Sequence, residues 1–193
     1  SAEAGAITLG QGSCKQPYTT SSVINISGMS YGAISKPAVR ALSKGAAAAG
    51  IWMNTGEGGL SPYHLEGGCD LVFQIGTAKY GVRTAEGVLD PVKLAAVAAH
   101  PQVKMFEIKL AQGAKLRGGH VEGSKVNPEI AEIRGVTPWK NVDSPNRHKQ
   151  FHDTATLFDF IDELRDLGGK PIGIKVVMGG PNSADELCKA MAE

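Results

Sequence analysis

The sequence has few cysteines, and the three that it has lie far apart, at Cys14, Cys69 and Cys188 among 193 residues. An odd, widely spaced set argues against a disulfide framework, and it lacks the short spacing of a zinc or iron–sulfur motif. We therefore expect free thiols, a reducing and cytoplasmic location, and no metal site within this chain.

The sequence also lacks long apolar runs, an excess of charge and many aromatic residues. No apolar run approaches the roughly 20 residues that cross a bilayer, and the formal net charge is +1 with acidic and basic residues interspersed. These absences argue against a membrane segment in this chain and against a nucleic-acid groove. The 42% of hydrophobic residues and the 25 glycines are typical of α/β enzymes with many strand-to-loop transitions.

Strand and helix patterns alternate along the chain after residue 22. Residues 1–22 are small and polar, and we expect an irregular lead-in there, followed by one domain over 23–193. Short β-branched runs predict strands, and apolar residues at helical spacing behind Ser, Asp or Asn predict helices. The expected strands cover 23–26, 51–54, 70–75, 103–110 and 171–177, and the expected helices cover 36–49, 91–99, 128–133, 154–167 and a last one that begins with a capping box of Ser183 and Glu186.

This alternation predicts a parallel sheet joined by right-handed helical crossovers. Glycines and polar residues follow the carboxyl ends of the strands, where barrels and open α/β sheets carry their sites. No Gly-x-Gly-x-x-Gly follows the first strand, which disfavours a dinucleotide-binding open sheet. We predict a TIM (β/α)8 barrel with only the first five or so βα units present, since a closed barrel needs eight units and about 250 residues. The chain would then be the front portion of a longer polypeptide.

One loop is unusually rich in glycine. Asn54-Thr-Gly-Glu-Gly-Gly59 follows a predicted strand and carries a single carboxylate, that of Glu57. Glycines let a backbone approach a ligand closely or adopt a positive φ without steric cost. The loop therefore predicts a binding site, with an ordinary surface turn as the alternative.

Five motifs occur in one order along the chain. They are Ser27-Gly-Met-Ser-Tyr-Gly-Ala-Ile-Ser35, Asn54-Thr-Gly-Glu-Gly-Gly59, Lys109-Leu-Ala-Gln-Gly-Ala-Lys115, Ile133-Arg134 and Ser144-Pro145. Together they resemble the FMN-binding synthase domain of glutamate synthases and its stand-alone relatives, from about Cys14 to Met178. The resemblance implies a TIM barrel with FMN over its mouth. It also implies reductive amination of 2-oxoglutarate to L-glutamate through a 2-imino acid that receives hydride from reduced FMN.

The resemblance implies flavin contacts for residues near the strand ends. They are Met29 and Ser30 after the first strand, Thr55 and Gln74 at the ends of the second and third, and Lys109 and Lys175 at the ends of the fourth and fifth. A cation near the N1–O2 edge of the flavin would stabilise its anionic reduced form. The alternatives are a simple turn for Met29 and Ser30, a backbone partner for the Gln74 amide, and a structural ion pair for the lysines.

Substrate contacts are implied for Gln112, Lys115 and Arg134, because cationic side chains meet the two carboxylates of 2-oxoglutarate with charge-assisted hydrogen bonds. Glu57 is the candidate for handling protons at the imine or orienting ammonia, and Lys115 is the second candidate catalytic residue. Each is alternatively an exposed loop charge, and Arg134 is alternatively a partner of a helix dipole.

The chain departs from the family pattern after the Gln-Gly-Ala motif. The family usually has Lys-Pro-Gly-x-Gly-Gly and then Leu-Pro-Gly, whereas this chain has the shorter Lys115-Leu-Arg-Gly-Gly119 and then His120-Val-Glu-Gly123. Arg117 and His120 in this segment leave open another 2-oxo acid or an N-methylglutamate-type amine transfer. A non-catalytic barrel fragment or subunit is a further alternative.

Two parts of glutamate synthases have no counterpart in this sequence. The cysteines that bind a 3Fe–4S cluster are not in this chain, and neither is the amino-terminal cysteine of a glutaminase domain. Any cluster would be bound by residues outside the chain. A glutaminase or electron-donor subunit would then supply ammonia or electrons.

Overall fold

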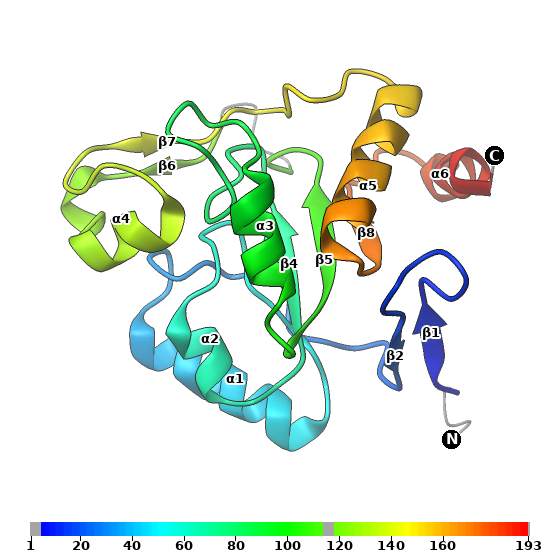
Figure 1. Cartoon of the computed structure of the whole chain (residues 1–193), viewed down its shortest axis with the longest axis horizontal. Coiled ribbons are helices and arrows are strands. Elements are labelled where there is room, and N and C mark those ends of the chain that lie inside the picture. The colour runs from blue at the N-terminus through cyan, green and yellow to red at the C-terminus, as the bar shows by residue number, and fades with distance from the viewer. Residues whose placement is uncertain (1–4, 114–117, 193) are drawn as a thin grey trace.

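The computed structural model describes residues 5–113 and 118–192 and has an α/β fold. Its centre is a parallel sheet with the strand order β3 (Met53–Asn54), β4 (Leu71–Ile75), β5 (Val103–Lys109) and β8 (Ile172–Lys175). Strand order follows chain order, with helices between successive strands (Figure 1). This is the arrangement of the first part of a TIM barrel, as the sequence predicts.

Helices and two short antiparallel strand pairs complete the described part of the chain. The helices are α1 (Lys36–Ala49), α2 (Pro62–Glu66), α3 (Pro91–Ala98), α4 (Pro128–Arg134), α5 (Thr154–Gly168) and α6 (Ser183–Ala192), with a 3-10 turn η1 at Gly123–Lys125. The antiparallel pairs are β1 (Ile7–Leu9) with β2 (Tyr18–Thr20), and β6 (His120–Val121) with β7 (Val142–Asp143). None of the helices in the described ranges is long and apolar enough to cross a membrane.

Local signals explain where the helices begin and end. Ser35 accepts a hydrogen bond from the Ala38 amide at the start of α1, and Gly50 ends that helix with φ 64°. A glycine tolerates this left-handed conformation, so α1 has the bounds that its sequence predicts. Asp153 and Thr156 form a capping box at the start of α5.

The hydrophobic core lies between the sheet and the helices α3 and α5. Every residue of β4 is buried, and the rings of Phe73 and Phe106 meet edge to face with centroids 5.8 Å apart. Leu94 of α3 and Leu164 of α5 are fully buried in the same cluster, and both helices lie beside β4 and β5 in Figure 1. Because side chains alternate along a strand, the polar side chains of the sheet point to the opposite face.

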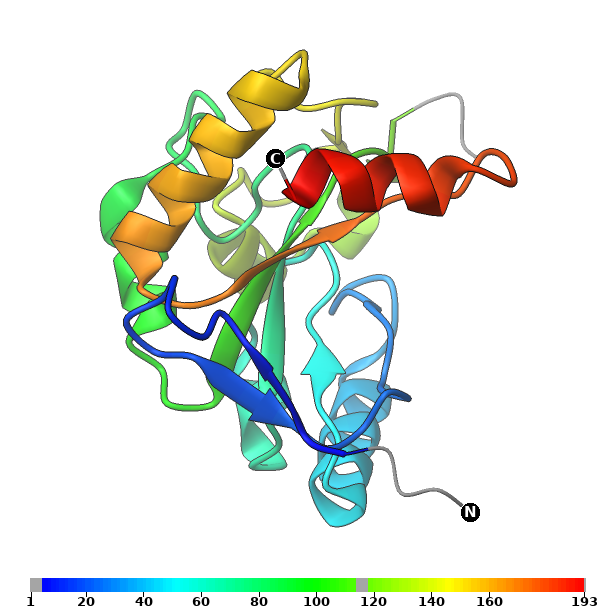
Figure 2. The same cartoon turned by 90° about the vertical axis from the view of Figure 1, so that its right-hand side faces the viewer.

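The amino-terminal region differs from the irregular lead-in that the sequence predicts. β1 and β2 pair in an antiparallel hairpin, in which Thr8 and Thr19 share a hydrogen bond between their hydroxyls at 2.9 Å. Both views place this hairpin near the amino-terminal ends of the sheet strands (Figures 1 and 2). The Tyr18 hydroxyl donates to Asp70 at 3.0 Å and fixes the hairpin beside the start of β4.

The first predicted strand, 23–26, is reduced to a single parallel bridge between Ile26 and Met53. The cause is local competition for backbone groups. The Ser22 hydroxyl accepts from the Ile24 amide, and the Asn25 side chain donates to the Ser22 carbonyl. Such side-chain bonds divert the backbone from a sheet ladder. The predicted capping box at Ser183 is also displaced, because the Ser183 hydroxyl accepts from the Gly180 amide.

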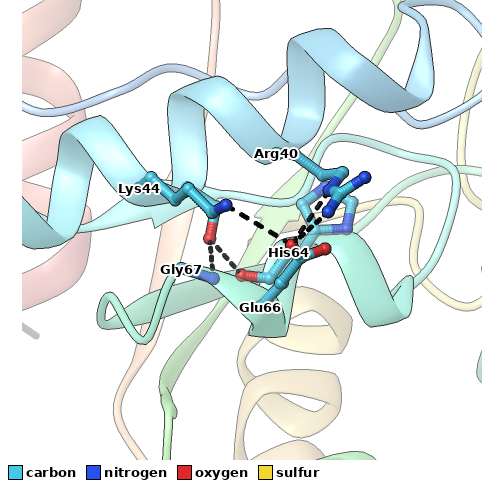
Figure 3. Close-up of polar contacts among 6 residues, drawn as sticks. Arg40, Lys44, His64, Glu66 and Gly67 are labelled. Carbon is cyan, nitrogen blue, oxygen red and sulfur yellow. Dashed lines mark hydrogen bonds and ion pairs between the residues drawn. The ribbon is translucent and has the colours of Figure 1, made fainter.

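The short helix α2, which the sequence did not predict, packs on α1 directly after the glycine loop. The buried Ser43 hydroxyl of α1 donates to the His64 carbonyl at 2.6 Å and accepts from the Gly67 amide at 2.9 Å. Arg40 and Lys44 form an exposed ion-pair cluster with Glu66 above this joint (Figure 3). The joint holds the end of the glycine loop against the body of the domain.

Candidate active site

A cavity of about 320 Å³ opens at the carboxyl ends of the sheet strands. Its lining comes from the loop before α1, the glycine loop, β4, β5, β6 and α4. The residues that line it are Gly28, Met29, Ser30, Ala33, Ile34, Glu57, Gln74, Lys109, Gln112, Gly119, His120, Val121 and Arg134. Most of the residues predicted for the site are therefore brought together in one place.

Two larger hollows lie elsewhere on the molecule. One of about 740 Å³ is formed by residues 145–157, and one of about 560 Å³ lies behind α4. Neither is lined by a residue predicted for the site. The smaller cavity gathers acidic, basic and amide groups at the strand ends, so it is the better candidate for chemistry.

Asn54 organises the glycine loop, although the sequence analysis gave it no role. Its side-chain oxygen accepts from the Gly56 amide at 2.9 Å, and its side-chain nitrogen donates to Glu107 at 2.8 Å. Gly56 has φ 69°, and a Cβ at this position would lie 2.5 Å from the Ser30 backbone nitrogen. Only glycine lets the loop pass this close to the backbone of Ser30.

Glu57 points from the glycine loop toward two hydrogen-bond donors. Gln112 donates its amide to one carboxylate oxygen at 2.9 Å, and Ser144 donates its hydroxyl to the other at 3.1 Å. Ser144 also contacts the Tyr80 hydroxyl at 3.2 Å, and Gln112 contacts Thr77 at 3.4 Å. Donors to both oxygens fix the direction of the carboxylate.

Arg134 is the most unusual side chain of the cavity. It is the last residue of α4, it is 1% exposed, and one of its terminal nitrogens donates to the Tyr31 carbonyl at 3.3 Å. Its guanidinium lies 5.0 Å from the centre of the Tyr80 ring. Nε and Nη1 are buried and have no hydrogen-bond partner among the described residues. Burial lowers the pKa of Arg134, but an arginine stays charged.

Two tyrosines hold α4 beside the cavity. Tyr31 donates to Glu129 at 2.7 Å, and Tyr63 donates to the other oxygen of the same carboxylate. The two rings meet edge to face at 5.1 Å. The hydrogen bonds from Tyr63 and Tyr31 lower the pKa of Glu129, so the carboxylate stays ionised. This cluster ties α4, and with it Arg134, to the loops that follow the first two predicted strands.

The two predicted lysines lie side by side at the ends of adjacent strands. The register of the sheet pairs Lys109 of β5 with Lys175 of β8, which confirms their predicted equivalence. Lys109 lines the cavity, whereas Lys175 lines a neighbouring hollow of about 220 Å³ together with Asn54 and Glu107. Burial raises the pKa of Glu107, and the Lys175 charge, the Asn54 hydrogen bond and the Lys109 charge oppose this rise.

Besides Lys175, one further described residue of the predicted site, Thr55, does not line the cavity. Thr55 is fully buried. Its hydroxyl donates to the Gly56 carbonyl at 3.1 Å and accepts from the backbone N–H of Gln74 at 3.1 Å. It supports the glycine loop from behind. Lys115 lies outside the described residues. Among the residues that the structure does describe, no group of three or more His, Cys, Asp or Glu side chains is placed to hold a metal ion.

Three contributors besides Asn54 carry no signal of their role in the sequence. Ser144 and Tyr80 orient Glu57, and Asp143 pairs with His120 at the rim of the cavity. Ser144-Pro145 is one of the five motifs of the family resemblance, but nothing in the sequence shows that Ser144 lies opposite Glu57. These contacts join segments that are far apart in the chain.

The chain is similar to known proteins of one family. The family described as "Conserved region in glutamate synthase" matches residues 2–193. The glutamate synthase large subunit-like protein YerD of Bacillus subtilis is 49% identical over 184 residues, which cover 95% of this chain and 35% of that protein. The archaeal glutamate synthase [NADPH] of Archaeoglobus fulgidus is 33% identical over 156 residues, which cover 79% of this chain and 28% of that protein.

A third relative gives the same result. The archaeal-type glutamate synthase [NADPH] of Thermotoga sp. (strain RQ2) is 31% identical over 151 residues, or 77% of this chain and 27% of that protein. The chain thus spans about a third of the length of the curated relatives that it matches. From the strand-end cavity, the matched region and these identities, we conclude that the chain belongs to the glutamate synthase family.

Proposed function

We propose that this chain forms the flavin and substrate face of an FMN-dependent enzyme that makes L-glutamate from 2-oxoglutarate and ammonia. The observation that carries the proposal is the buried guanidinium of Arg134, whose Nε and Nη1 have no partner among the described residues, at the edge of a cavity shared with Glu57 and Lys109. A buried arginine of this kind needs an anion, and a 2-oxo acid supplies one.

The cavity also suits a flavin. The backbone of Gly28, Met29 and Ser30, with Ala33 and Ile34, offers a lining of backbone and apolar atoms. The Gln74 amide and the Lys109 ammonium offer polar groups for the edge of a ring. When bound, reduced FMN supplies the hydride for the reaction. Lys109, with Lys175 beside it, would place positive charge where the reduced ring is anionic.

The chain's own residues divide the remaining tasks. Arg134, Gln112 and Lys115 bind and orient the 2-oxo acid, and Glu57 holds ammonia or a proton near the carbon that is aminated. The contacts of Gln112 support this division, since its amide donates to Glu57 and its side-chain oxygen lies 3.5 Å from the Lys109 ammonium. Holding the reactants in one geometry lowers the entropic part of the barrier.

The remaining assignments concern the complete protein. We infer that any 3Fe–4S cluster is bound by residues outside this chain, and that a glutaminase or electron-donor subunit delivers ammonia or electrons. The described cysteines Cys14, Cys69 and Cys188 are free thiols, which supports a cytoplasmic location.

The test is a single-turnover experiment with the complete protein. The protein is loaded with FMN, reduced chemically without oxygen, and mixed with ammonium and 2-oxoglutarate while the visible flavin absorbance is followed. We expect reoxidation of the flavin together with formation of L-glutamate. A flavin that stays reduced with saturating substrates would refute the proposal.

Arg134→Lys tests the anion site in the same experiment. Lysine keeps the charge but loses the planar fork of donors. We expect the concentration of 2-oxoglutarate that gives half-maximal rate to rise about 10- to 100-fold, the range for losing a hydrogen bond to a charged group. Arg83→Lys is the matched control, because Arg83 also lies over the Tyr80 ring, at 5.7 Å, but does not line the cavity.

A further inference from the structure

His120 is a titratable side chain of the cavity that the proposed function leaves unused. It lies on β6, directly across the antiparallel pair from Asp143 on β7. Its Nδ1 is 2.6 Å from a carboxylate oxygen of Asp143, and its side chain is 51% exposed. His120 therefore touches both the cavity and the solvent.

The Asp143 contact favours one tautomer of the ring. A carboxylate accepts but does not donate, so Nδ1 carries the hydrogen in this pair. Nε2 is then left as the nitrogen that takes up or releases a proton. A carboxylate on the far nitrogen of a histidine also stabilises the imidazolium once it forms.

Among the described residues, three other charged side chains line the cavity, those of Glu57, Lys109 and Arg134. Glu57 of the glycine loop accepts from Gln112 and Ser144, Lys109 of β5 contacts Gln112, and Arg134 of α4 keeps its charge. Histidine is the side chain that exchanges protons near neutral pH. Among the described residues of the cavity, His120 is the histidine placed to do so.

We propose that His120, oriented by Asp143, is the general acid–base group that moves protons during formation of the imine, an inference that rests on the proposed function. The end of β7 and the residue after it orient two ionisable side chains of the cavity, His120 and Glu57. Asp143 of β7 holds His120, and the next residue, Ser144, holds Glu57. The Ser144 amide also donates to the Gly119 carbonyl at 2.8 Å, so the two sides of the pair stay in register.

The proton balance closes within one turnover. His120 Nε2 takes one proton from ammonium, and the ammonia that forms adds to the carbonyl carbon of the 2-oxo acid to give a carbinolamine. The imidazolium then returns its proton to the departing hydroxyl group. Water leaves, the C–N double bond of the iminium forms, and His120 is neutral again. The sum is 2-oxo acid plus ammonium giving iminium acid plus water.

The experiment is chemical rescue in the complete, FMN-loaded protein. His120→Ala is mixed in the reduced state with ammonium and 2-oxoglutarate, with and without added imidazole. We expect the rate of flavin reoxidation to fall about 10²- to 10³-fold, within the range for general acid–base catalysis. Added imidazole should raise the reoxidation rate of His120→Ala at least tenfold, because the half-exposed position leaves room for the free base. The half-saturating 2-oxoglutarate concentration should stay within about twofold.

His152→Ala is the matched control. His152 is an exposed histidine that also pairs with an aspartate, Asp153, at 3.4 Å, but it does not line this cavity. We expect its rate to equal that of the unmodified protein, with or without imidazole.

The outcomes separate this inference from the function on which it rests. If the unmodified protein does not reoxidise its flavin with 2-oxoglutarate and ammonium, the proposed function fails. If it does and His120→Ala is equally fast, the acid–base role is overturned. A slow variant that imidazole does not rescue, with weakened 2-oxoglutarate binding, would give His120 a binding role instead and would also overturn it.

Asp143→Asn adds a readout that does not depend on activity. Nitrogen-15 NMR of the His120 ring reports which nitrogen carries the hydrogen. We expect the Nδ1–H form to dominate in the unmodified protein, and its share to fall in Asp143→Asn because an amide can also donate. An unchanged tautomer ratio would show that Asp143 does not orient the ring.

Discussion

Two walls of the cavity are built in different ways. The strand-end wall comprises residues 27–34 and 54–60 with Gln74 and Lys109, and the β6–β7 wall comprises residues 118–123 and 141–148. In the first, Asn54, Thr55 and Gln74 are buried and hydrogen-bonded to the sheet or its loops. In the second, two-residue strands present His120 and Asp143, whose side chains are 51% and 76% exposed.

The difference separates two functional demands. A cofactor that stays bound needs a wall whose shape does not depend on the substrate, and the strand-end wall is anchored in the central sheet. Substrates must enter and leave, and the β6–β7 wall meets Glu57 through the single hydroxyl of Ser144. We therefore expect changes in the first wall to act on folding and flavin binding, and changes in the second to act on turnover.

The largest effect is expected from Gly56→Ala in the strand-end wall. Alanine in the left-handed conformation costs about 1–2 kcal/mol, and overpacking adds about 1–3 kcal/mol, because the new Cβ would lie 2.5 Å from the Ser30 nitrogen. We expect the free energy of unfolding, from urea titration of the complete protein, to fall by about 2–5 kcal/mol, with weaker FMN binding.

Gly113→Ala is the matched control for crowding. Gly113 also has a positive φ, 67°, but among the described residues a Cβ there would meet a single atom within 4 Å, a Val177 methyl group at 3.8 Å. Gly113→Ala should lower the free energy of unfolding by about 1–2 kcal/mol, the part that comes from the backbone conformation alone. Equal losses for the two variants would show that the glycine loop is not held tightly against Ser30.

The sequence predicts most of the elements around the strand-end wall, the strand expected at 23–26 excepted, because the signals there are local. Ser35 and Gly50 give both ends of α1, and the glycine spacing marks the loop that carries Glu57. β4 follows from its continuous apolar run. Each of these features depends on neighbours within a few residues, which a sequence displays directly.

The β6–β7 wall and the surroundings of Arg134 were not predictable in the same way. β6 and β7 are two residues long and pair across more than twenty positions, as His120 with Asp143, so no periodicity marks them. Arg134 is polar and ends a short helix, and its burial follows from Tyr31 and Tyr80, which come from distant segments. Contacts of this kind are set by the assembled fold and leave no local pattern.

The second-largest effect is expected in the β6–β7 wall, where His148 should make the protein less stable at acidic pH. Its ring donates from Nε2 to the Lys109 carbonyl at 2.9 Å and stacks on Phe151. Burial lowers the pKa of His148 from 6.5 to about 4, partly offset by the Lys109 bond, and the Lys79 charge lowers it further. Between these values the unfolded chain binds a proton that the folded chain does not, so stability must fall as the pH drops.

The window and the slope follow from these pKa values. The contribution of neutral His148 is complete above pH 6.5 and is lost toward pH 4, at about 1.4 kcal/mol per pH unit. We expect His148→Gln to reduce the pH slope of the unfolding free energy by that amount. Burial also lowers the pKa of His64 to about 4, so an equal part of the slope should remain in the variant. If the pH slope of the unfolding free energy is the same in His148→Gln and in the unmodified protein, His148 is already protonated in the folded state between pH 4 and 6.5.

The smallest effect is expected beneath the strand-end wall, at the joint between α1 and α2. Ser43→Ala removes the hydroxyl that bonds His64 and Gly67, and we expect a loss of about 1 kcal/mol in the free energy of unfolding. FMN affinity should not change, since the joint lies outside the cavity. Glu66→Gln is the control, because its ion pairs with Arg40 and Lys44 are exposed and contribute little. If Ser43→Ala weakened FMN binding as much as Gly56→Ala, the rigidity of the strand-end wall would come from α2 rather than from the sheet.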